Sequence, residues 1–295
     1  MIMSPLKSIK NPFKIFANKQ PSSENARHAR KYWRKNHSFF SLSKSTLALS
    51  LAFLFLPLMV ITLFSFNSAK SANFEGFSLI WYEKLFFESD DLWKALLNSL
   101  VIAVDSSLVA TLIGSLAAIG IGWYKFFGKS YIQTISFLPM VLPEVIMGVS
   151  LLIFFNGINF GLGMKSIFIA HTTFCLPFVY LMVSARIDEF DYSIIEAAHD
   201  LGANEFQTLT KVIIPAIMPG VTSGYMMSVT MSLEDYVITS LVNGAGSVTL
   251  PIKIYNMMRV GVSPVINSLS FVLILTICAI VLVLRGSLKN FAASR

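Results

Sequence analysis

Six long stretches without a charged residue are the feature that most constrains what this chain can fold into. They are residues 45–69, 106–124, 145–164, 166–185, 212–233 and 260–284, and each holds 19 to 25 residues. An α-helix rises about 1.5 Å per residue and the hydrocarbon core of a bilayer is about 30 Å thick, so each stretch can cross a membrane with little trimming or extension. The sequence therefore predicts six transmembrane helices.

The composition agrees with a membrane protein. Hydrophobic residues make up 55% of the 295 residues and charged residues only 13%, whereas a soluble domain is about 25% charged. Strands of an outer-membrane barrel alternate in polarity over roughly ten residues, but runs such as 51–61 are apolar on every side. We therefore predict an all-α membrane protein and exclude a disordered chain, while an ordinary soluble enzyme is not expected.

The charged and turn-forming residues divide the chain into two tails and one transmembrane domain. The N-terminal tail is 1–44, the domain is 45–286 and the C-terminal tail is 287–295, with a polar segment at 186–215 inside the domain. More than forty residues precede the first helix and no small-residue cleavage site follows it, so it is not expected to be a cleaved signal peptide. The predicted spans are about 45–66, 97–124, 131–155, 166–185, 216–238 and 266–285.

Lys and Arg are distributed unequally between the two sides of these helices. The segments on the side of the N-terminus hold 17 of them and the segments on the other side hold 6. Basic loops stay in the cytoplasm, so we expect both termini to be cytoplasmic in a multi-pass protein of the cytoplasmic membrane. The basic block 27–35 lies beside a span, where such clusters meet anionic lipid, so the net charge of +7 requires no nucleic acid.

Motifs for nucleotide binding or catalysis are not supported. The stretch 122–130 resembles a phosphate-binding loop, but it has five residues between its glycines instead of four and follows a membrane helix instead of a strand. His171 stands alone with no G-x-S-x-G turn, and we interpret it as a packing or hydrogen-bonding residue. Cys175 and Cys278 both lie inside predicted spans. We expect no enzymatic activity, no cofactor and no metal site.

The polar segment 186–215 carries the most informative pattern. Gly202 suits a left-handed turn at the end of a short helix, and Pro215 suits the first turn of the next helix, where its missing N–H costs nothing. We interpret this helix as a docking element on the cytoplasmic face, and the alternative is an ordinary amphipathic helix in a loop. One side of the helix is apolar, through Ile194, Ile195, Ala198 and Leu201.

The order Glu196-Ala197-Ala198, Gly202 and Pro215 resembles the signature of ABC importer permeases, in which this loop inserts into a groove of the ATPase subunit. The resemblance extends over about residues 66–284, and the long basic N-terminal tail departs from it. Other stretches are similar to the PotC-type permeases of spermidine/putrescine importers, namely Phe174–Phe178, Glu196–Pro219, Ser232–Asp235, Leu250–Tyr255 and Val260–Pro264.

This resemblance implies a type I ABC importer permease fold with a cytoplasmic coupling helix. It implies a subunit that translocates polyamines while a separate ATPase subunit hydrolyses ATP. The implied partners are a second, PotB-like permease, a dimer of ATPase subunits and a soluble polyamine-binding protein outside the membrane. The residues implied for coupling are Glu196, Ala197, Ala198, Gly202 and Pro215.

Acidic residues in or near the spans are the candidates for meeting a cationic cargo. A charge at mid-bilayer costs about 2.5–3.5 kcal/mol on insertion scales, so such residues face a partner or a pathway. Glu144 and the pair Glu234-Asp235 qualify, and the resemblance places acids at both positions; Tyr225 and Tyr236 offer aromatic faces to ammonium groups. Alternatively, the pair is hydrated at the membrane surface, and at most one of its members faces the pathway because adjacent helical residues point about 100° apart.

Two further residue patterns and two alternative transport functions are also consistent with the sequence. Asp105 either meets the cargo or pairs with another helix, and the spacing of Gly220 and Gly224 predicts a tight helix contact. A permease of the same architecture for ferric iron or an oxyanion is one alternative, although spans without Lys or Arg argue against an oxyanion. A stand-alone secondary transporter is another, but such proteins often show internal repeats, and we find no duplicated half.

Overall fold

The computed structural model describes residues 42–70, 73–261 and 263–293. The chain divides into two compact units, 1–63 and 64–295, which are described separately. Helix α2 (Leu42–Phe64) accounts for the described part of the first unit and has Pro57 in its interior. All but the last three residues of the predicted basic tail, 1–44, lie outside the described residues.

The second unit is helical throughout most of its described length. Its elements are α3 (Ile80–Phe87), α4 (Asp90–Trp123), α5 (Lys129–Ser136), α6 (Leu138–Val141), α7 (Glu144–Gly157), α8 (Met164–Asp188), α9 (Ser193–Asp200), α10 (Glu205–Thr208), the π-helical turn η2 (Leu209–Ile213), α11 (Ile214–Glu234), α12 (Val237–Val242), α13 (Leu250–Val260) and α14 (Pro264–Ala293). Among the described residues, five helices are long and apolar enough to cross a membrane, and a bent pair makes a sixth crossing if it counts as one span.

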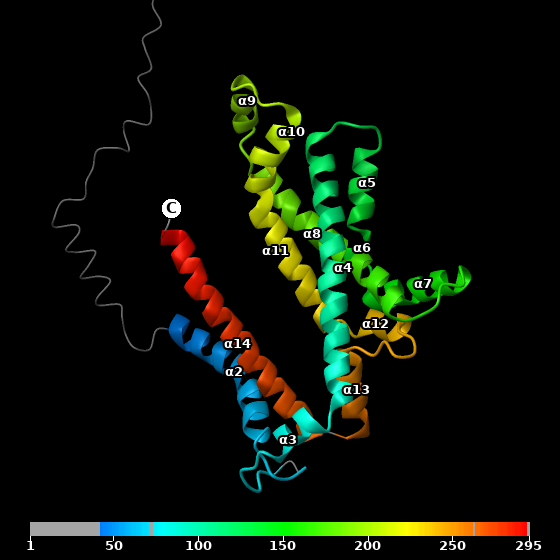
Figure 1. The fold of residues 1–295 in the computed structure, drawn as a ribbon, viewed down its shortest axis with the longest axis vertical. Coiled ribbons are helices and arrows are strands. Elements are labelled where there is room, and N and C mark those ends of the chain that lie inside the picture. The colour runs from blue at the N-terminus through cyan, green and yellow to red at the C-terminus, as the bar shows by residue number, and fades with distance from the viewer. Residues whose placement is uncertain (1–41, 71–72, 262, 294–295) are drawn as a thin grey trace, which may run out of the picture. The chain divides into compact units, whose positions relative to one another are not determined.

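Three long helices, α4, α8 and α11, pack against one another and form the centre of the second unit (Figure 1). Small residues allow this close approach. A Cβ at Gly114 of α4 would lie 2.9 Å from the Cβ of Val179, and one at Gly224 of α11 would lie 3.2 Å from the Cα of Val179. A Cβ at Gly220 would lie 2.9 Å from the carbonyl oxygen of Met182. The tight contact predicted from Gly220 and Gly224 is therefore confirmed.

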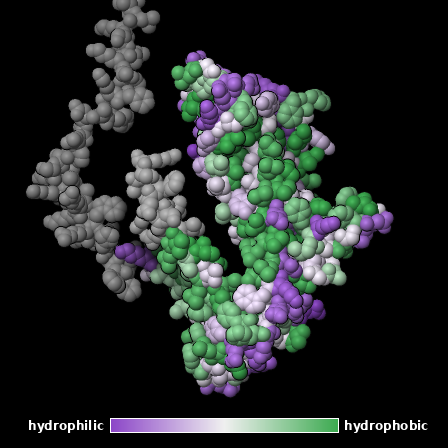
Figure 2. Space-filling view, in the orientation of Figure 1, coloured by the Kyte–Doolittle hydropathy of each residue, from purple (hydrophilic) through white to green (hydrophobic). Residues whose placement is uncertain are grey.

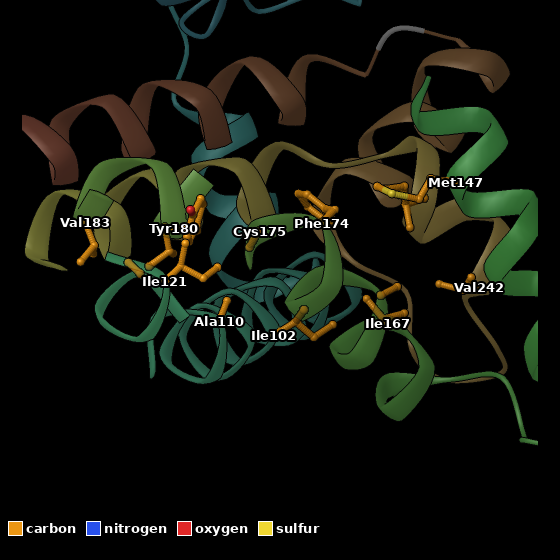
Figure 3. Close-up of a cluster of buried hydrophobic side chains, with 14 of the residues drawn as sticks. Ile102, Ala110, Ile121, Met147, Ile167, Phe174, Cys175, Tyr180, Val183 and Val242 are labelled. Carbon is orange, nitrogen blue, oxygen red and sulfur yellow. The ribbon is translucent and has the colours of Figure 1, made fainter. Parts of the chain in front are cut away.

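The hydrophobic core runs along these helices and reaches α7 and α12 (Figure 3). It joins residues far apart in sequence into one buried cluster, so the short helices at the ends are attached to a packed bundle. Members of the cluster include Ile102, Ala110, Ile121, Met147, Ile167, Phe174, Cys175, Tyr180, Val183 and Val242.

The span predicted over 131–155 is not one straight helix, because the structure breaks it. Lys129–Val141 and Glu144–Gly157 are bent by 107° relative to each other. Leu142 at the break is extended, with φ −73° and ψ 138°. The next residue, Pro143, explains this, because a proline lacks an N–H and disfavours helical geometry in the residue before it. The bend directs α7 away from the axis of α5 and α6 and places Glu144 at its start.

Other helix boundaries differ from the predicted ones by several residues. Helix α4 begins at Asp90 instead of 97, with two acids in its first turn, where they complement the helix dipole. Helix α11 ends at Glu234 instead of 238, because Asp235 is extended with ψ 123°. Helix α14 continues to Ala293 and includes most of the predicted C-terminal tail, 287–295. The short helices α3 and α13 were not predicted.

The second unit has two polar ends. On the face in Figure 2, hydrophilic side chains gather over α9 and α10 at one end and around α3 and α13 at the other, with hydrophobic ones between. We call these the α9 end and the α13 end. At the α13 end, Ser99 accepts a hydrogen bond from the Leu250 N–H at 2.8 Å, and Lys253 pairs with Asp91 at 3.3 Å. These contacts fasten α13 to the first turns of α4.

Candidate functional site

The segment that resembles a coupling loop forms helix α9 at the α9 end, and its last turn is closed by Gly202. The Gly202 N–H donates to the His199 carbonyl at 2.8 Å, and the Ala203 N–H donates to the Ala198 carbonyl at 3.0 Å. These two bonds are a Schellman cap, which needs a left-handed residue. Gly202 has φ +84°, so the predicted left-handed turn is confirmed.

A second cap starts the next helix immediately. The Asn204 side chain accepts from the Gln207 N–H at 2.8 Å, and the Gln207 side chain accepts from the Asn204 N–H at 3.1 Å. This reciprocal pair satisfies two backbone donors that the start of α10 would otherwise leave free. The chain then makes the π-helical turn, in which the Ile214 N–H donates to the Leu209 carbonyl five residues back. Pro215 follows as the second residue of α11, within its first turn as predicted.

The surface of this segment presents apolar side chains to its surroundings. Leu201 is 90% exposed and Phe206 is 73% exposed, on either side of the Gly202 turn. Glu196 and Ala197 are exposed, while Ala198 is half-buried. Two large exposed apolar side chains therefore flank the capped turn. Four of the five predicted coupling residues lie in this short capped segment, and the fifth, Pro215, lies in the first turn of α11.

The predicted pathway acids lie in different environments. Glu144 is exposed at the first residue of α7, directly after the bend. Glu234 is exposed at the last residue of α11, whereas its neighbour Asp235 is 8% exposed. Asp105 is exposed on α4 and forms no ion pair with any residue that the structure describes, so the predicted pairing with another helix is not seen among those residues.

The two tyrosines predicted near these acids also differ. Tyr225 is half-buried on α11. The ring of Tyr236 packs against that of Tyr255 of α13, with centroids 4.4 Å apart and planes inclined by 35°, and the Arg259 guanidinium lies 5.9 Å from the centre of the Tyr255 ring. One face of Tyr236 is therefore covered by another ring.

Asp235 is held by an internal network at the break between α11 and α12. Its Oδ1 accepts from the Ile238 N–H at 3.3 Å, and its Oδ2 accepts from the Thr239 N–H at 2.8 Å and the Thr239 hydroxyl at 2.6 Å. His171 Nε2 lies 3.3 Å from the same Oδ2. The carboxylate thus caps the first turn of α12, and its acceptor positions are engaged within the protein.

His171 connects three helices in this network. Its Nδ1 lies 2.6 Å from the Ser232 hydroxyl in the last turn of α11, and its Nε2 lies 2.8 Å from the Thr239 hydroxyl in α12. The Thr239 hydroxyl has a single hydrogen and donates it to Asp235, so its oxygen accepts from His171 Nε2–H. Nδ1 is then free to accept from Ser232. The interpretation of His171 as a hydrogen-bonding residue is confirmed.

Ser232 and Thr239 are the members that sequence reasoning missed. Hydroxyl residues are common in membrane helices, where most bond to their own backbone, as Thr222 does to Met218. A histidine and an acid in neighbouring apolar spans were the available signal, because each needs a buried partner. The spacing alone does not say which hydroxyl supplies it.

Comparisons with known proteins assign this architecture to a family. Residues 110–294 match the model of the "binding-protein-dependent transport system inner membrane component". The chain belongs to this family. It is 41% identical, over 80% of its length and 89% of the relative's, to the spermidine/putrescine transport system permease protein PotC of Escherichia coli (strain K12). It is 37% identical, over 76% and 82%, to the putrescine transport system permease protein PotI of the same organism.

Solved structures confirm the fold. A bacterial alginate ABC transporter, in complex with an alginate-pentasaccharide-bound periplasmic protein, superposes with a TM-score of 0.66 and 17% identity, over 86% of this chain and 94% of that one. The fold is therefore that of type I ABC importer permeases. As a member of the inner-membrane-component family, the chain is a transport subunit and not an enzyme.

Proposed function

We propose that this chain is one of two permease subunits of an ATP-driven polyamine importer in the bacterial cytoplasmic membrane. The observation that carries the proposal is the 41% identity, over most of both chains, to a relative named for spermidine/putrescine transport. The exposed carboxylates of Glu144 and Glu234 support it, because ammonium groups are what such acids bind best in a span otherwise free of charge.

The partners follow from what a permease of this family must add. A second, PotB-like permease completes the pathway, a dimer of ATPase subunits supplies the energy, and a soluble polyamine-binding protein delivers the cargo. The capped α9 segment with its exposed Leu201 and Phe206 is the surface that fits a groove of the ATPase subunit. The α13 end, at the opposite end of α4, then faces the binding protein.

This assignment fixes the orientation of the chain. The α9 end is cytoplasmic and the α13 end is on the outer side. Both termini are cytoplasmic, with the basic tail 1–44 against anionic lipid, because 17 of the 23 Lys and Arg residues lie on that side.

The acidic residues at the pathway have two different roles. Glu144 and Glu234 contact the ammonium groups of the cargo, since their carboxylates are exposed. Asp235 holds the turn beside Glu234, since its oxygens are occupied by Thr239 and the Ile238 N–H. Tyr225 and the open face of Tyr236 border the pathway as aromatic surfaces for cations.

Coupling follows from the rigid attachment of α9 to α11. ATP binding closes the ATPase dimer, moves α9 as a capped unit and shifts the pathway from inward-facing to outward-facing; hydrolysis resets it. Each conformation must bind nucleotide with a different affinity, because a ligand shifts an equilibrium only by its differential affinity for the two states. Glu196, Ala197, Ala198, Gly202 and Pro215 are the residues through which we expect this coupling to act.

The decisive experiment is uptake by proteoliposomes that contain the full complex. Radiolabelled spermidine and putrescine are offered with ATP and binding protein, or with an ion gradient and no ATP, and ferric iron and sulfate are offered in parallel. The proposal predicts uptake of polyamines driven by ATP alone. Uptake driven by the gradient, or of iron or sulfate in place of polyamines, would refute it.

A further inference from the structure

The short helix α12 follows Glu234 in the chain and packs against α7, whose first residue is Glu144. At its first turn it is fixed by Asp235 and Thr239, one residue after Glu234. Along its side it packs against α7, and α7 makes most of its helix contacts with α12. Helix α12 therefore connects the turn beside Glu234 to α7.

The contact between α12 and α7 is close and lies near Glu144. A Cβ at Gly148 of α7 would lie 2.7 Å from Leu241 Cδ1 and 3.3 Å from the Cα of Ile238, both in α12. Gly148 is four residues after Glu144, so the two share one side of α7. The Ile238 N–H is in turn bound by Asp235 Oδ1 at 3.3 Å. A continuous chain of contacts thus runs from the Asp235 turn through α12 to the start of α7.

His171 anchors this chain of contacts to the packed core. Its side chain is 1% exposed and projects from α8, which packs against both α4 and α11. Through Nε2 it holds Thr239 of α12, and through Nδ1 it holds Ser232, two residues before Glu234. The Ser232 hydroxyl also lies 3.4 Å from that of Ser106 in α4, so the network reaches the third core helix.

We propose that His171 is a positioning residue that sets the separation of the Glu144 and Glu234 carboxylates and thereby the preference among polyamines. The inference rests on the proposed function, because it names what fixes the geometry of the same cargo site. Polyamines differ in the number of methylene groups between their ammonium groups. Two carboxylates held at one separation therefore favour one spacing of charges over another, since each ammonium must meet its acid in the same bound pose.

The test compares uptake kinetics for putrescine and spermidine in the reconstituted complex with variants at two points of the chain of contacts. His171→Leu removes both hydrogen bonds of the imidazole, and His171→Gln retains a donor that reaches Thr239. Gly148→Ala places a Cβ against α12 without touching the imidazole. The matched control is Gly157→Ala in the same helix, where a Cβ meets nothing within 4 Å.

The expected result is a change in the ratio of the specificity constants for the two polyamines. We expect a change of at least threefold, expressed mainly in KM, in His171→Leu and Gly148→Ala. His171→Gln should lie between His171→Leu and the wild type, and Gly157→Ala should match the wild type. A merely structural role of His171 would lower the maximal rate for both cargoes equally and leave their ratio unchanged.

The outcomes separate this inference from the proposed function. If the wild-type complex shows no ATP-driven polyamine uptake, the proposed function fails. If the wild type transports polyamines but His171→Leu and Gly148→Ala keep its preference ratio, the positioning role is wrong. If His171→Leu does not assemble, the ratio in His171→Gln decides: a shift supports the inference and an unchanged ratio overturns it.

Discussion

The α9 end and the His171 network are built in opposite ways. At the α9 end the shaping hydrogen bonds join residues three to five positions apart, such as Gly202 with His199, and Leu201 is 90% exposed. In the His171 network at the break between α11 and α12, the bonds of His171 join residues 61 and 68 positions apart, and its side chain is 1% exposed. The first arrangement leaves large apolar side chains exposed, and the second buries its polar groups between three helices.

The largest effect is expected from placing a charge on the exposed surface of the α9 end. Leu201→Asp should weaken association with the ATPase subunits by at least about tenfold, because burying that side chain is worth about 1.5–3 kcal/mol. Stability of the permease itself should change by no more than about 0.5 kcal/mol. The measurement is retention of the ATPase subunits during purification. Val260→Asp, at a residue 93% exposed on α13, is the control and should retain the ATPase subunits. Equal loss of these subunits in both variants would contradict binding at the α9 end.

A change in the His171 network should lower the stability of the protein instead of its association with the ATPase subunits. Thr239→Val removes the hydroxyl that donates to the buried Asp235 carboxylate at 2.6 Å and accepts from His171. Leaving such a group unsatisfied costs about 1–3 kcal/mol, so the thermal unfolding midpoint of the purified complex should fall by several degrees. Thr222→Val, at an exposed hydroxyl bonded to its own helix, should leave the midpoint unchanged. An unchanged midpoint in Thr239→Val would mean that the network does not hold the turn.

The sequence predicts the local features of the α9 end better than the long-range contacts of the His171 network. The Gly202 turn and the first turn at Pro215 depend on neighbours along the chain, so local patterns were sufficient to predict them. The break at Pro143 was missed because the apolar run through it outweighed the local signal of a single proline. The hydroxyl partners of His171 were missed because long-range contacts in a membrane bundle depend on packing of helices that carry no pairing signal.

A backbone change at the α9 end should have an intermediate effect on the coupling between ATP hydrolysis and transport. Gly202→Ala forces a side chain into a left-handed conformation at φ +84°, which costs about 1–2 kcal/mol, although a Cβ there meets nothing within 4 Å. Cargo-stimulated ATP hydrolysis should therefore fall about tenfold in the reconstituted complex. Gly120→Ala, a helical glycine with equally open surroundings, should show wild-type stimulation. Equal rates of cargo-stimulated ATP hydrolysis in the two variants would mean that the Gly202 turn of α9 takes no part in coupling.

The smallest effect concerns the start of α9. The Ser193 N–H donates to Asp191 Oδ1 at 3.0 Å and holds the pKa of that carboxyl below its ordinary value. A lowered pKa means that the stabilising contribution is complete at neutral pH and is lost only on strong acidification. Asp191→Ala should speed amide hydrogen exchange in the first turn of α9 a few-fold, by the same factor between about pH 6 and 8. A factor that varies within this range would contradict the assignment.

The most direct test of the account is the Glu144→Gln/Glu234→Gln double variant, measured in the full complex for polyamine uptake and ATPase association together. We expect the polyamine concentration for half-maximal uptake to rise at least about tenfold, because two charge-assisted contacts are each reduced to neutral ones. Association with the ATPase subunits should stay at the wild-type level, because the α9 end is untouched. Wild-type uptake and an unchanged preference among polyamines would contradict the assignment of these carboxylates to the cargo.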